Sequence, residues 1–327
     1  MIKVGLAAAG FMARTHAAAY KELAEQLDVK IVAVADIRED LAKTTAQEFN
    51  ATAYTSVDDL INDPNVDVVD ICLPTFLHAE YAAKAMRAGK SVFLEKPAIL
   101  KPEEGEMLLA VQKETGAKVM VGHCIRLWPQ YMYLKDLYDN GTYGSLKNLT
   151  MKRLSFLPTY GWDNWFEDEK LSGNAILDLH IHDVDFMRYL LGEPNNIKIG
   201  GSKEHVFGIY NYENGVSVQI EGAWDYPQGF PFAMEYRARF EKAAVVYSDG
   251  KLMVYPDDGE SFEVDQKSEV ASAGDLGGNL SELGGYYNEL RYFYDCLIND
   301  KPMTIAPLSE GIASVNFVYK EIAAGGF

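Results

Sequence analysis

The first 122 residues alternate short apolar runs with longer segments that have helical spacing. The apolar runs read IKVGLAA, VKIVAVAD, VDVVDICL, KSVFLE and AKVMVG. Helix signals lie between them: Ser56 stands three residues before Asp59 in a capping arrangement, and Pro102 and Gly116 bracket another helical segment. Strands that alternate with helices predict a parallel sheet covered by helices on both faces.

The pattern changes at about residue 146, where strand-like runs follow one another without helices between them. Two of the connections contain the hairpin dipeptides Asn214-Gly215 and Asp249-Gly250. One long helix is predicted at about residues 173–191, and two more near the end of the chain. This region therefore predicts a large, mostly antiparallel sheet interrupted by a helix.

We expect two domains, residues 1–122 and residues 123–327, because 327 residues suffice for two cores and no long linker separates them. An apolar content of 48% with 24% charged residues is typical of a soluble globular protein. The net charge of −18, with no basic run, repels phosphate backbones and anionic membranes. Neither nucleic acid nor a membrane is an expected partner.

The cysteines and the start of the chain favour a reducing, cytoplasmic location. Cys72, Cys124 and Cys296 are odd in number and form no CxxC or Cys/His spacing, so we expect free thiols and no metal site. The apolar stretch VGLAAAGFMA is interrupted by glycines and followed directly by Arg14, unlike a secretory signal.

A glycine-rich turn, AAAGFMA, connects the first predicted strand to a helix. Such a turn lets backbone amides at a helix N-terminus approach a pyrophosphate, although an ordinary strand-to-helix turn is the alternative. The G-x-G-x-x-G pattern is degraded, because alanines stand at its first and third glycine positions. The predicted cofactor-binding residues of the turn are Ala8, Gly10, Phe11 and Met12.

Asp36 ends the second predicted strand, near where an acidic residue binds a ribose 2′-hydroxyl. This favours NAD, since the 2′-phosphate of NADP would meet the carboxylate's charge. Arg38 could accept that phosphate, so NADP stays possible. A solvated strand end is the alternative interpretation of Asp36.

The third long strand ends in CLPTFLHAEYA, which predicts a sharp turn at the carboxyl edge of the sheet. Open α/β sheets bind ligands at this edge, so Leu73, Pro74 and Thr75 are expected to contact the cofactor. His78 lies one turn into the following helix, where it either contacts the cofactor or is merely close to the helix cap.

The next strand, SVFLE, is followed by a lysine and a proline. Glu95, Lys96 and Pro97 do not suit the middle of a sheet, but a strand's carboxyl end faces the ligand cleft. We therefore expect Glu95 and Lys96 at the cofactor end of this cleft, where their charges would act on a substrate.

The long helix contains charged residues at regular spacing. Asp178, His182 and Asp185 follow one another at i, i+4 and i+7, which predicts that they lie in one stripe along the helix. This stripe is either part of a functional site or a solvent-exposed face. His180 and His182, at i and i+2, point to different sides and cannot chelate one metal ion. His180 is expected to be packed or capped.

Aromatic residues precede this helix in YGWDNWFEDEKLSG. Trp162 and Trp165 would suit stacking against a sugar, or packing against another part of the protein. The same two interpretations apply to Trp128 and Tyr131, which follow Arg126.

Three segments together resemble one protein family: ICLPTFLHAEYAAKAMRAGKSVFLEKPAIL, RLWP and GNAILDLHIHDVDFMRYLLGEP. They are similar to the glucose-fructose oxidoreductase, inositol dehydrogenase and rhizopine-catabolism family (Gfo/Idh/MocA), and the similarity runs through essentially the whole chain. It implies an N-terminal Rossmann domain that holds NAD or NADP. It also implies a C-terminal α+β domain with a large, mostly antiparallel sheet that often makes homodimer or homotetramer contacts.

The resemblance further implies reversible oxidation of a sugar or cyclic polyol hydroxyl. By position, Lys96 is the motif lysine between nicotinamide and substrate, and Asp178 and His182 complete the catalytic set. The family also implies a cis bond before Pro97 and a substrate-binding role for Arg126.

Three positions depart from the family pattern. Ala8 replaces a glycine, His180 stands where glycine is common, and Cys124 stands where asparagine is common. The last two suggest a subgroup with its own substrate.

The residue types fit this chemistry. An imidazole can take the hydroxyl proton at neutral pH, so His182 is the expected base. Lys96 would stabilise the developing alkoxide, and Asp178 would orient the sugar or His182. A redox-cycling glycoside hydrolase or lyase would need the same three residues, and a non-catalytic dinucleotide or sugar sensor is a third possibility.

Overall fold

A computed structural model describes residues 1–265 and 283–327, which fold into two compact units. The first unit contains Met1–Cys124, Tyr160–Trp165 and, from residue 283, the described part of Glu269–Val315; the second contains Ile125–Thr159, the described part of Phe166–Ser268, and Asn316–Phe327. The division into domains 1–122 and 123–327 stays a prediction, although the first change of unit, after Cys124, lies close to its boundary.

The first unit contains a six-stranded, fully parallel sheet, as the alternating pattern predicts. In spatial order the strands are β3 (Thr52–Tyr54), β2 (Val29–Ala35), β1 (Ile2–Ala7), β4 (Val68–Ile71), β5 (Ser91–Glu95) and β6 (Val119–Gly122). The strand order reverses between β1 and β4, and ligands bind at the carboxyl edge of such a switch point. This arrangement confirms the predicted Rossmann-type sheet.

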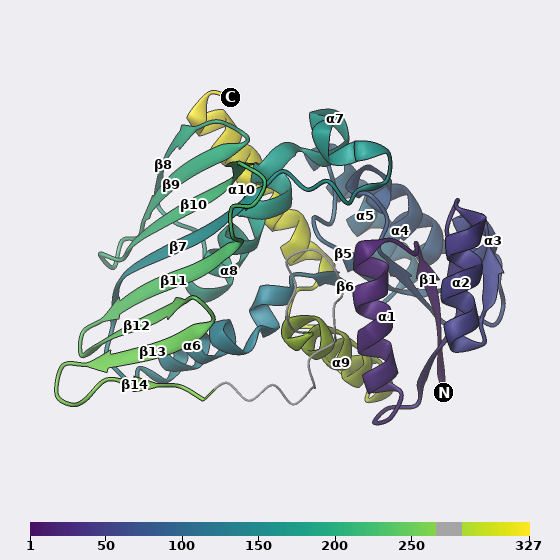
Figure 1. Cartoon of the computed structure of the whole chain (residues 1–327), viewed down its shortest axis with the longest axis horizontal. Coiled ribbons are helices and arrows are strands. Elements are labelled where there is room, and N and C mark those ends of the chain that lie inside the picture. The colour runs from purple at the N-terminus through teal and green to yellow at the C-terminus, as the bar shows by residue number, and fades with distance from the viewer. Residues whose placement is uncertain (266–282) are drawn as a thin grey trace. The chain divides into compact units, whose positions relative to one another are not determined.

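Helices connect these strands: α1 (Phe11–Leu23), α2 (Glu39–Phe49), α3 (Val57–Asn62), η1 (Thr75–Leu77), α4 (His78–Arg87) and α5 (Pro102–Thr115). The predicted caps are present, since Ser56 Oγ accepts the Asp59 N–H at 3.3 Å and Gly116 ends α5 with a left-handed φ of 69°. The late helix α9 (Gly284–Ile298) also belongs to this unit and packs along α1 (Figure 1).

The second unit contains an eight-stranded sheet in the order β14-β13-β12-β11-β7-β10-β9-β8. These strands are β7 (Leu146–Phe156), β8 (Asn196–Gly201), β9 (His205–Asn211), β10 (Ser217–Tyr226), β11 (Ala233–Phe240), β12 (Ala243–Ser248), β13 (Lys251–Pro256) and β14 (Phe262–Glu263). All pairs are antiparallel except β10 with β7, so the predicted mostly antiparallel sheet is confirmed.

Helices pack against one face of this sheet. The predicted long helix begins as a π-helix, η4 (Ile176–His180), and continues as α8 (Ile181–Leu191). It lies with α6 (Pro129–Asn140) along the same face (Figure 1). The last helix, α10 (Leu308–Gly325), enters the second unit at residue 316. No helix among the described residues is long and apolar enough to cross a membrane.

Candidate functional site

The turn after β1 brings the ends of two neighbouring strands together. Ala8 donates its N–H to Ala35 O at 2.8 Å, and the Ala9 N–H donates to Asp36 Oδ2 at 2.9 Å. Ala8 has a φ of 109°, in the region that side-chain-bearing residues rarely adopt. The alanine at the first glycine position of the motif therefore has a glycine-like backbone conformation.

Ala8→Gly is expected to stabilise the protein by about 0.5–1 kcal/mol. A positive φ costs an alanine roughly 1–2 kcal/mol, and the extra unfolded-state freedom of glycine offsets about half of this gain. Urea unfolding of the purified protein measures the change. The matched control is Ala9→Gly, because Ala9 has no positive φ and should lose stability. Equal behaviour of the two variants would contradict the strain at residue 8.

Asp36 is held by two neighbours at the end of β2. Its carboxylate accepts hydrogen bonds from Arg38 Nε and a terminal guanidinium nitrogen, each at 2.9 Å, and from the Arg38 N–H. Burial raises the pKa of Asp36, but hydrogen bonds from Arg38 and from the Ala9 amide outweigh it and keep the pKa below its usual range. Asp36 is thus a buried, ionised acceptor, and the solvated-strand-end interpretation is wrong.

His78 connects the two loops that follow β4 and β5. Its Nδ1 lies 2.7 Å from Pro97 O, and its Nε2 lies 2.8 Å from Leu73 O. Burial lowers the pKa of His78, opposed by these two carbonyl oxygens. Pro74 and the buried Thr75 begin the 3-10 helix η1 beside it. The structure therefore makes His78 a buried link between loops, and its contact with a cofactor stays a prediction.

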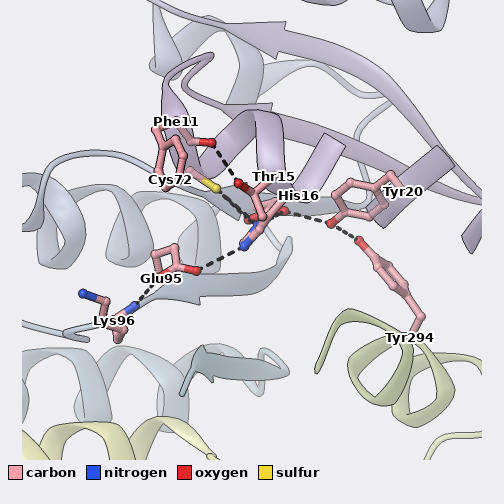
Figure 2. A network of polar contacts seen from close by, with 9 residues as sticks. Phe11, Thr15, His16, Tyr20, Cys72, Glu95, Lys96 and Tyr294 are labelled. Carbon is pink, nitrogen blue, oxygen red and sulfur yellow. Dashed lines mark hydrogen bonds and ion pairs between the residues drawn. The ribbon is translucent and has the colours of Figure 1, made fainter. Parts of the chain in front are cut away.

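Lys96 directly follows β5 at the carboxyl edge of the parallel sheet. Its bond to Pro97 is cis, which confirms the expectation taken from the family. The Lys96 backbone N–H donates to Glu95 Oε2 at 3.0 Å, and its side chain points away from that carboxylate (Figure 2). Glu95 thus fixes the backbone of the lysine whose ammonium group is the candidate catalytic group.

Glu95 belongs to a buried chain of polar contacts (Figure 2). Its Oε1 lies 3.1 Å from His16 Nε2, and His16 Nδ1 lies 2.9 Å from Asp70 Oδ2. Asp70 also accepts a hydrogen bond from Tyr20 at 2.9 Å, and Tyr20 meets Tyr294 at 2.8 Å. The network therefore joins α1, β4, β5 and α9, and reaches the Lys96 backbone through Glu95.

Sequence reasoning did not identify this network. A polar signal was present, because Asp70 interrupts the apolar run VDVVDICL and His16 lies in an alanine-rich helix. The two residues are separated by 54 positions, and His16 is 79 positions from Glu95. No local spacing predicts contacts over such separations.

His16 is surrounded by acidic groups at distances that a metal site could also have. Atoms of His16, Glu95 and Glu289 lie within 4.8 Å of one another, as do those of His16, Asp70 and Cys72. Both ring nitrogens of His16 face carboxylates, so a doubly protonated ring satisfies the described contacts. Burial lowers the pKa of His16, but the interactions with Asp70 and Cys72 together outweigh it and raise the pKa well above its usual value. The expectation of no metal stays a prediction.

Asp178 and His182 lie on the η4–α8 helix of the second unit. Their side chains are 9% and 8% exposed, so both are at the border of the core. Asp178 lies in the π-helical turn, a local geometry that is frequent at functional sites. Lys96 belongs to the first unit, and the meeting of these three residues in one site stays a prediction.

Asp185, the third member of the predicted stripe, has a different partner. It receives two hydrogen bonds of 2.7 Å from the Arg126 guanidinium, which also lies 4.6 Å from the centre of the Tyr189 ring. All three members of the stripe are buried, so the solvated-face interpretation is wrong. Arg126 is held by an ion pair inside the second unit, and its role in substrate binding stays a prediction.

His180 is fully buried, which confirms the expectation that it is packed. Its Nε2 lies 3.4 Å from Glu321 Oε1 and 3.3 Å from the Tyr210 hydroxyl. A Cβ at Gly222 would come within 2.6 Å of His180 Cβ, so the histidine requires a glycine on β10. His180 therefore anchors the helix to the sheet.

The aromatic candidates differ in exposure. Trp162, in η3 (Trp162–Glu167), is 46% exposed, and Trp165 is half-buried. Tyr131 is buried against Phe186 and Tyr236, with ring centres 4.9 and 5.3 Å apart, so it is a packing residue. Trp162 has an indole surface available for a ligand, and sugar stacking by Trp162 and Trp165 stays a prediction.

Two family models match the chain. Residues 2–123 match the model of an oxidoreductase family with an NAD-binding Rossmann fold (GFO_IDH_MocA). Residues 131–252 match the GFO/IDH/MocA C-terminal domain.

Curated relatives include several dehydrogenases. Inositol 2-dehydrogenase of Rhizobium meliloti (strain 1021) is 34% identical over 193 residues, which are 59% of this chain and 56% of the relative. Levoglucosan dehydrogenase of Pseudarthrobacter phenanthrenivorans is 32% identical over 209 residues, which are 59% of this chain and 52% of the relative. The match thus spans little more than half of these relatives' lengths.

Solved structures share the fold along nearly the whole chain. A levoglucosan dehydrogenase in complex with NADH and levoglucosan has a TM-score of 0.85 at 20% identity, covering 99% of this chain and 97% of that chain. An NAD-binding oxidoreductase from Klebsiella pneumoniae has a TM-score of 0.85 at 21% identity, covering 99% and 96%. At these identities the likeness shows the fold.

Proposed function

Because the chain belongs to the Gfo/Idh/MocA oxidoreductase family, we propose that it transfers a hydride between a hydroxyl-bearing carbon of a sugar or cyclic polyol and nicotinamide. The observation that carries this proposal is the position of Lys96, which follows β5 at the carboxyl edge of the NAD-binding fold. Relatives named inositol and levoglucosan dehydrogenases support the substrate class.

The turn into α1 fits a dinucleotide. In α1, which the structure describes in full, the first turn has no acidic residue and no side chain caps its amides. These amides can therefore face an anionic pyrophosphate, next to Gly10, Phe11 and Met12. At the end of β2, Asp36 suits a ribose 2′-hydroxyl, and NADP would require Arg38 to leave its bidentate pair with Asp36. We therefore favour NAD over NADP.

Bound nicotinamide would supply the hydride acceptor. His182 takes the hydroxyl proton from the substrate, since an imidazole can act as a base near neutral pH. Lys96 donates a hydrogen bond to the same oxygen and stabilises its developing negative charge, while Asp178 orients the sugar or His182. The remaining cofactor contacts in this proposal are Ala8, Leu73, Pro74, Thr75, His78 and Glu95, and the remaining substrate contacts are Arg126, Trp162 and Trp165.

A redox-cycling hydrolase or lyase is the second candidate function. It is favoured by one relative, the 2,7-anhydro-N-acetylneuraminate hydratase of Escherichia coli (strain K12), which is 29% identical over 204 residues, 60% of this chain and 52% of the relative. Such a reaction would consume the NADH that it forms, and Lys96, Asp178 and His182 would serve it equally well. A non-catalytic sensor is the third candidate. Lys96, Asp178 and His182 argue against it, because a binding protein has no evident need for a general base.

The test supplies NAD and NADP separately with a panel of inositols, aldoses, anhydro sugars and aryl glycosides, and follows NADH absorbance and product release. Net NADH with one substrate supports the dehydrogenase and identifies the cofactor. Product without net NADH supports the redox-cycling reaction. Bound cofactor without either signal over the whole panel would count against both reactions.

We also propose that the chain forms a homodimer or homotetramer through the sheet of the second unit. On β9, Phe207 and Ile209 are 50% and 40% exposed and alternate with buried residues, so one face of the sheet presents apolar side chains. Light scattering of the purified protein tests this, and a monomer at all concentrations would exclude it.

We place the protein in the cytoplasm. The three cysteines are free thiols, and Cys124 and Cys296 are buried, as expected in a reducing compartment. Cell fractionation tests this location, and recovery in an oxidising compartment would contradict it.

A further inference from the structure

Glu289 is a buried acidic side chain that the proposed reaction does not use. It lies in the first half of α9 with no exposed surface. Among the described residues, neither of its carboxylate oxygens has a hydrogen-bond partner. One of these oxygens lies within 4.8 Å of a His16 ring nitrogen and a Glu95 carboxylate oxygen. An ionised carboxylate in such a place would be uncompensated, whereas a protonated one is neutral.

The groups around Glu289 offer it little positive charge. Among the described titratable groups around Glu289, His16 is the one cation. Its two ring nitrogens already face Asp70 and Glu95. The groups that face the cluster are His16 and Tyr20 from α1, Asp70 and Cys72 from the end of β4, Glu95 from β5, Cys124 after β6, and Tyr286 and Tyr294 from α9. Burial raises the pKa of Cys72 and of the three tyrosines, so these groups are neutral.

We propose that Glu289 is a positioning residue that keeps its proton in the working protein, so that Glu95 remains free to hold the backbone of Lys96. The role in catalysis rests on the proposed function. Glu95 is fully engaged, with Oε1 on His16 and Oε2 on the Lys96 N–H. A second negative charge within 4.8 Å would repel Glu95 and compete for His16. Loss of the Glu289 proton would therefore weaken the hydrogen bond by which Glu95 holds the Lys96 backbone.

Glu289→Gln tests the proton directly, because glutamine has the shape of the neutral acid and stays uncharged at every pH. Burial, followed by the charge of Glu95, raises the pKa of Glu289 well above its usual value, opposed by His16. The wild type should therefore lose stability relative to the variant as pH rises above about 4.3, the ordinary glutamate value, towards the raised pKa. Thermal unfolding midpoints measured across pH show this divergence, and the exposed Glu106→Gln is the matched control.

Two further measurements need no substrate. The infrared spectrum of the wild type at neutral pH should contain the carbonyl stretch of a neutral carboxylic acid, which Glu289→Gln should lack. Hydrogen exchange of the Lys96 amide, corrected for its intrinsic pH dependence, should accelerate at alkaline pH in the wild type and much less in the variant. Absence of the infrared band, or equal exchange in both proteins, would overturn the proposal. Both results remain informative even if no sugar is turned over, so failure of the proposed function can be recognised separately.

Once a substrate is known, kcat and KM are measured across pH for both proteins. At the acid end kcat should agree within about twofold, and at the alkaline end the variant should exceed the wild type by about tenfold, with KM little changed. If folded Glu289→Gln instead had a kcat about tenfold or more below that of the wild type at every pH, the ionised form of Glu289 would be required and the proposal would be wrong. Elemental analysis that finds one metal ion per wild-type chain, absent from Glu289→Gln, would make Glu289 a ligand and equally overturn the proposal.

Discussion

His182→Asn is expected to lower kcat by about 10²–10⁴ while KM and NAD affinity change little. The side chain lies at the start of α8, on the border of the core, and asparagine retains its polarity and approximate size. Asparagine cannot accept the hydroxyl proton at neutral pH, so the loss should fall on the chemical step rather than on binding. Steady-state kinetics with the substrate found in the panel, together with NAD titration by fluorescence, measure both effects.

His205→Asn is the matched control in the same unit. His205 lies on β9, where its ring pairs with Asp225 at 2.9 Å and Glu221 at 3.3 Å at the surface. This variant removes an imidazole without touching α8, so its kcat should stay close to that of the wild type. If His182→Asn also retained full turnover, the base would have to be another residue, and the assignment of His182 would be wrong.

The sequence predicts the fold because each unit has its own hydrophobic period. Strand–helix alternation with capping residues such as Ser56 leaves few arrangements other than a parallel sheet, and the hairpin dipeptides indicate the antiparallel one. The short strand β3 was not predicted, because its three residues are largely exposed and carry no period. The packing of α9 along α1 was not predicted either, since a helix pattern does not specify a partner so far away; Tyr20 and Tyr294, which meet there, are 274 positions apart.

Charged residues on the long helix show where sequence reasoning stops. Regular spacing placed Asp178, His182 and Asp185 on one stripe, but Asp185 forms a buried pair with Arg126. Helical spacing predicts which residues share a face of one helix. It does not predict which residue of another element each of them contacts. The same reason explains why Glu95 was linked to a ligand cleft, whereas its contact with His16 was not foreseen.

Asp183→Ala is expected to destabilise the second unit by about 3–5 kcal/mol, the usual effect of removing one partner from a buried ion pair. Asp183 is fully buried on α8 and accepts hydrogen bonds of 3.0 and 3.1 Å from the Arg153 guanidinium on β7. Without the carboxylate, the guanidinium loses both of these hydrogen bonds while its charge remains buried beside the Tyr131 hydroxyl, 3.4 Å away. Urea unfolding, with a signal from the second unit, measures the loss.

Two further variants separate this effect from a general loss of charge. Asp139→Asn removes an exposed pair with Lys135 on α6, which should cost only about 0.3–0.5 kcal/mol. The double variant Arg153→Met/Asp183→Leu removes both buried charges, so it should be more stable than Asp183→Ala although it lacks two polar groups. A double variant as unstable as the sum of its single variants would mean that the pair itself, rather than the buried charge left behind by Asp183→Ala, accounts for the loss. Because this pair ties α8 to the sheet next to His182, the same comparison shows how firmly the fold holds the candidate base in place.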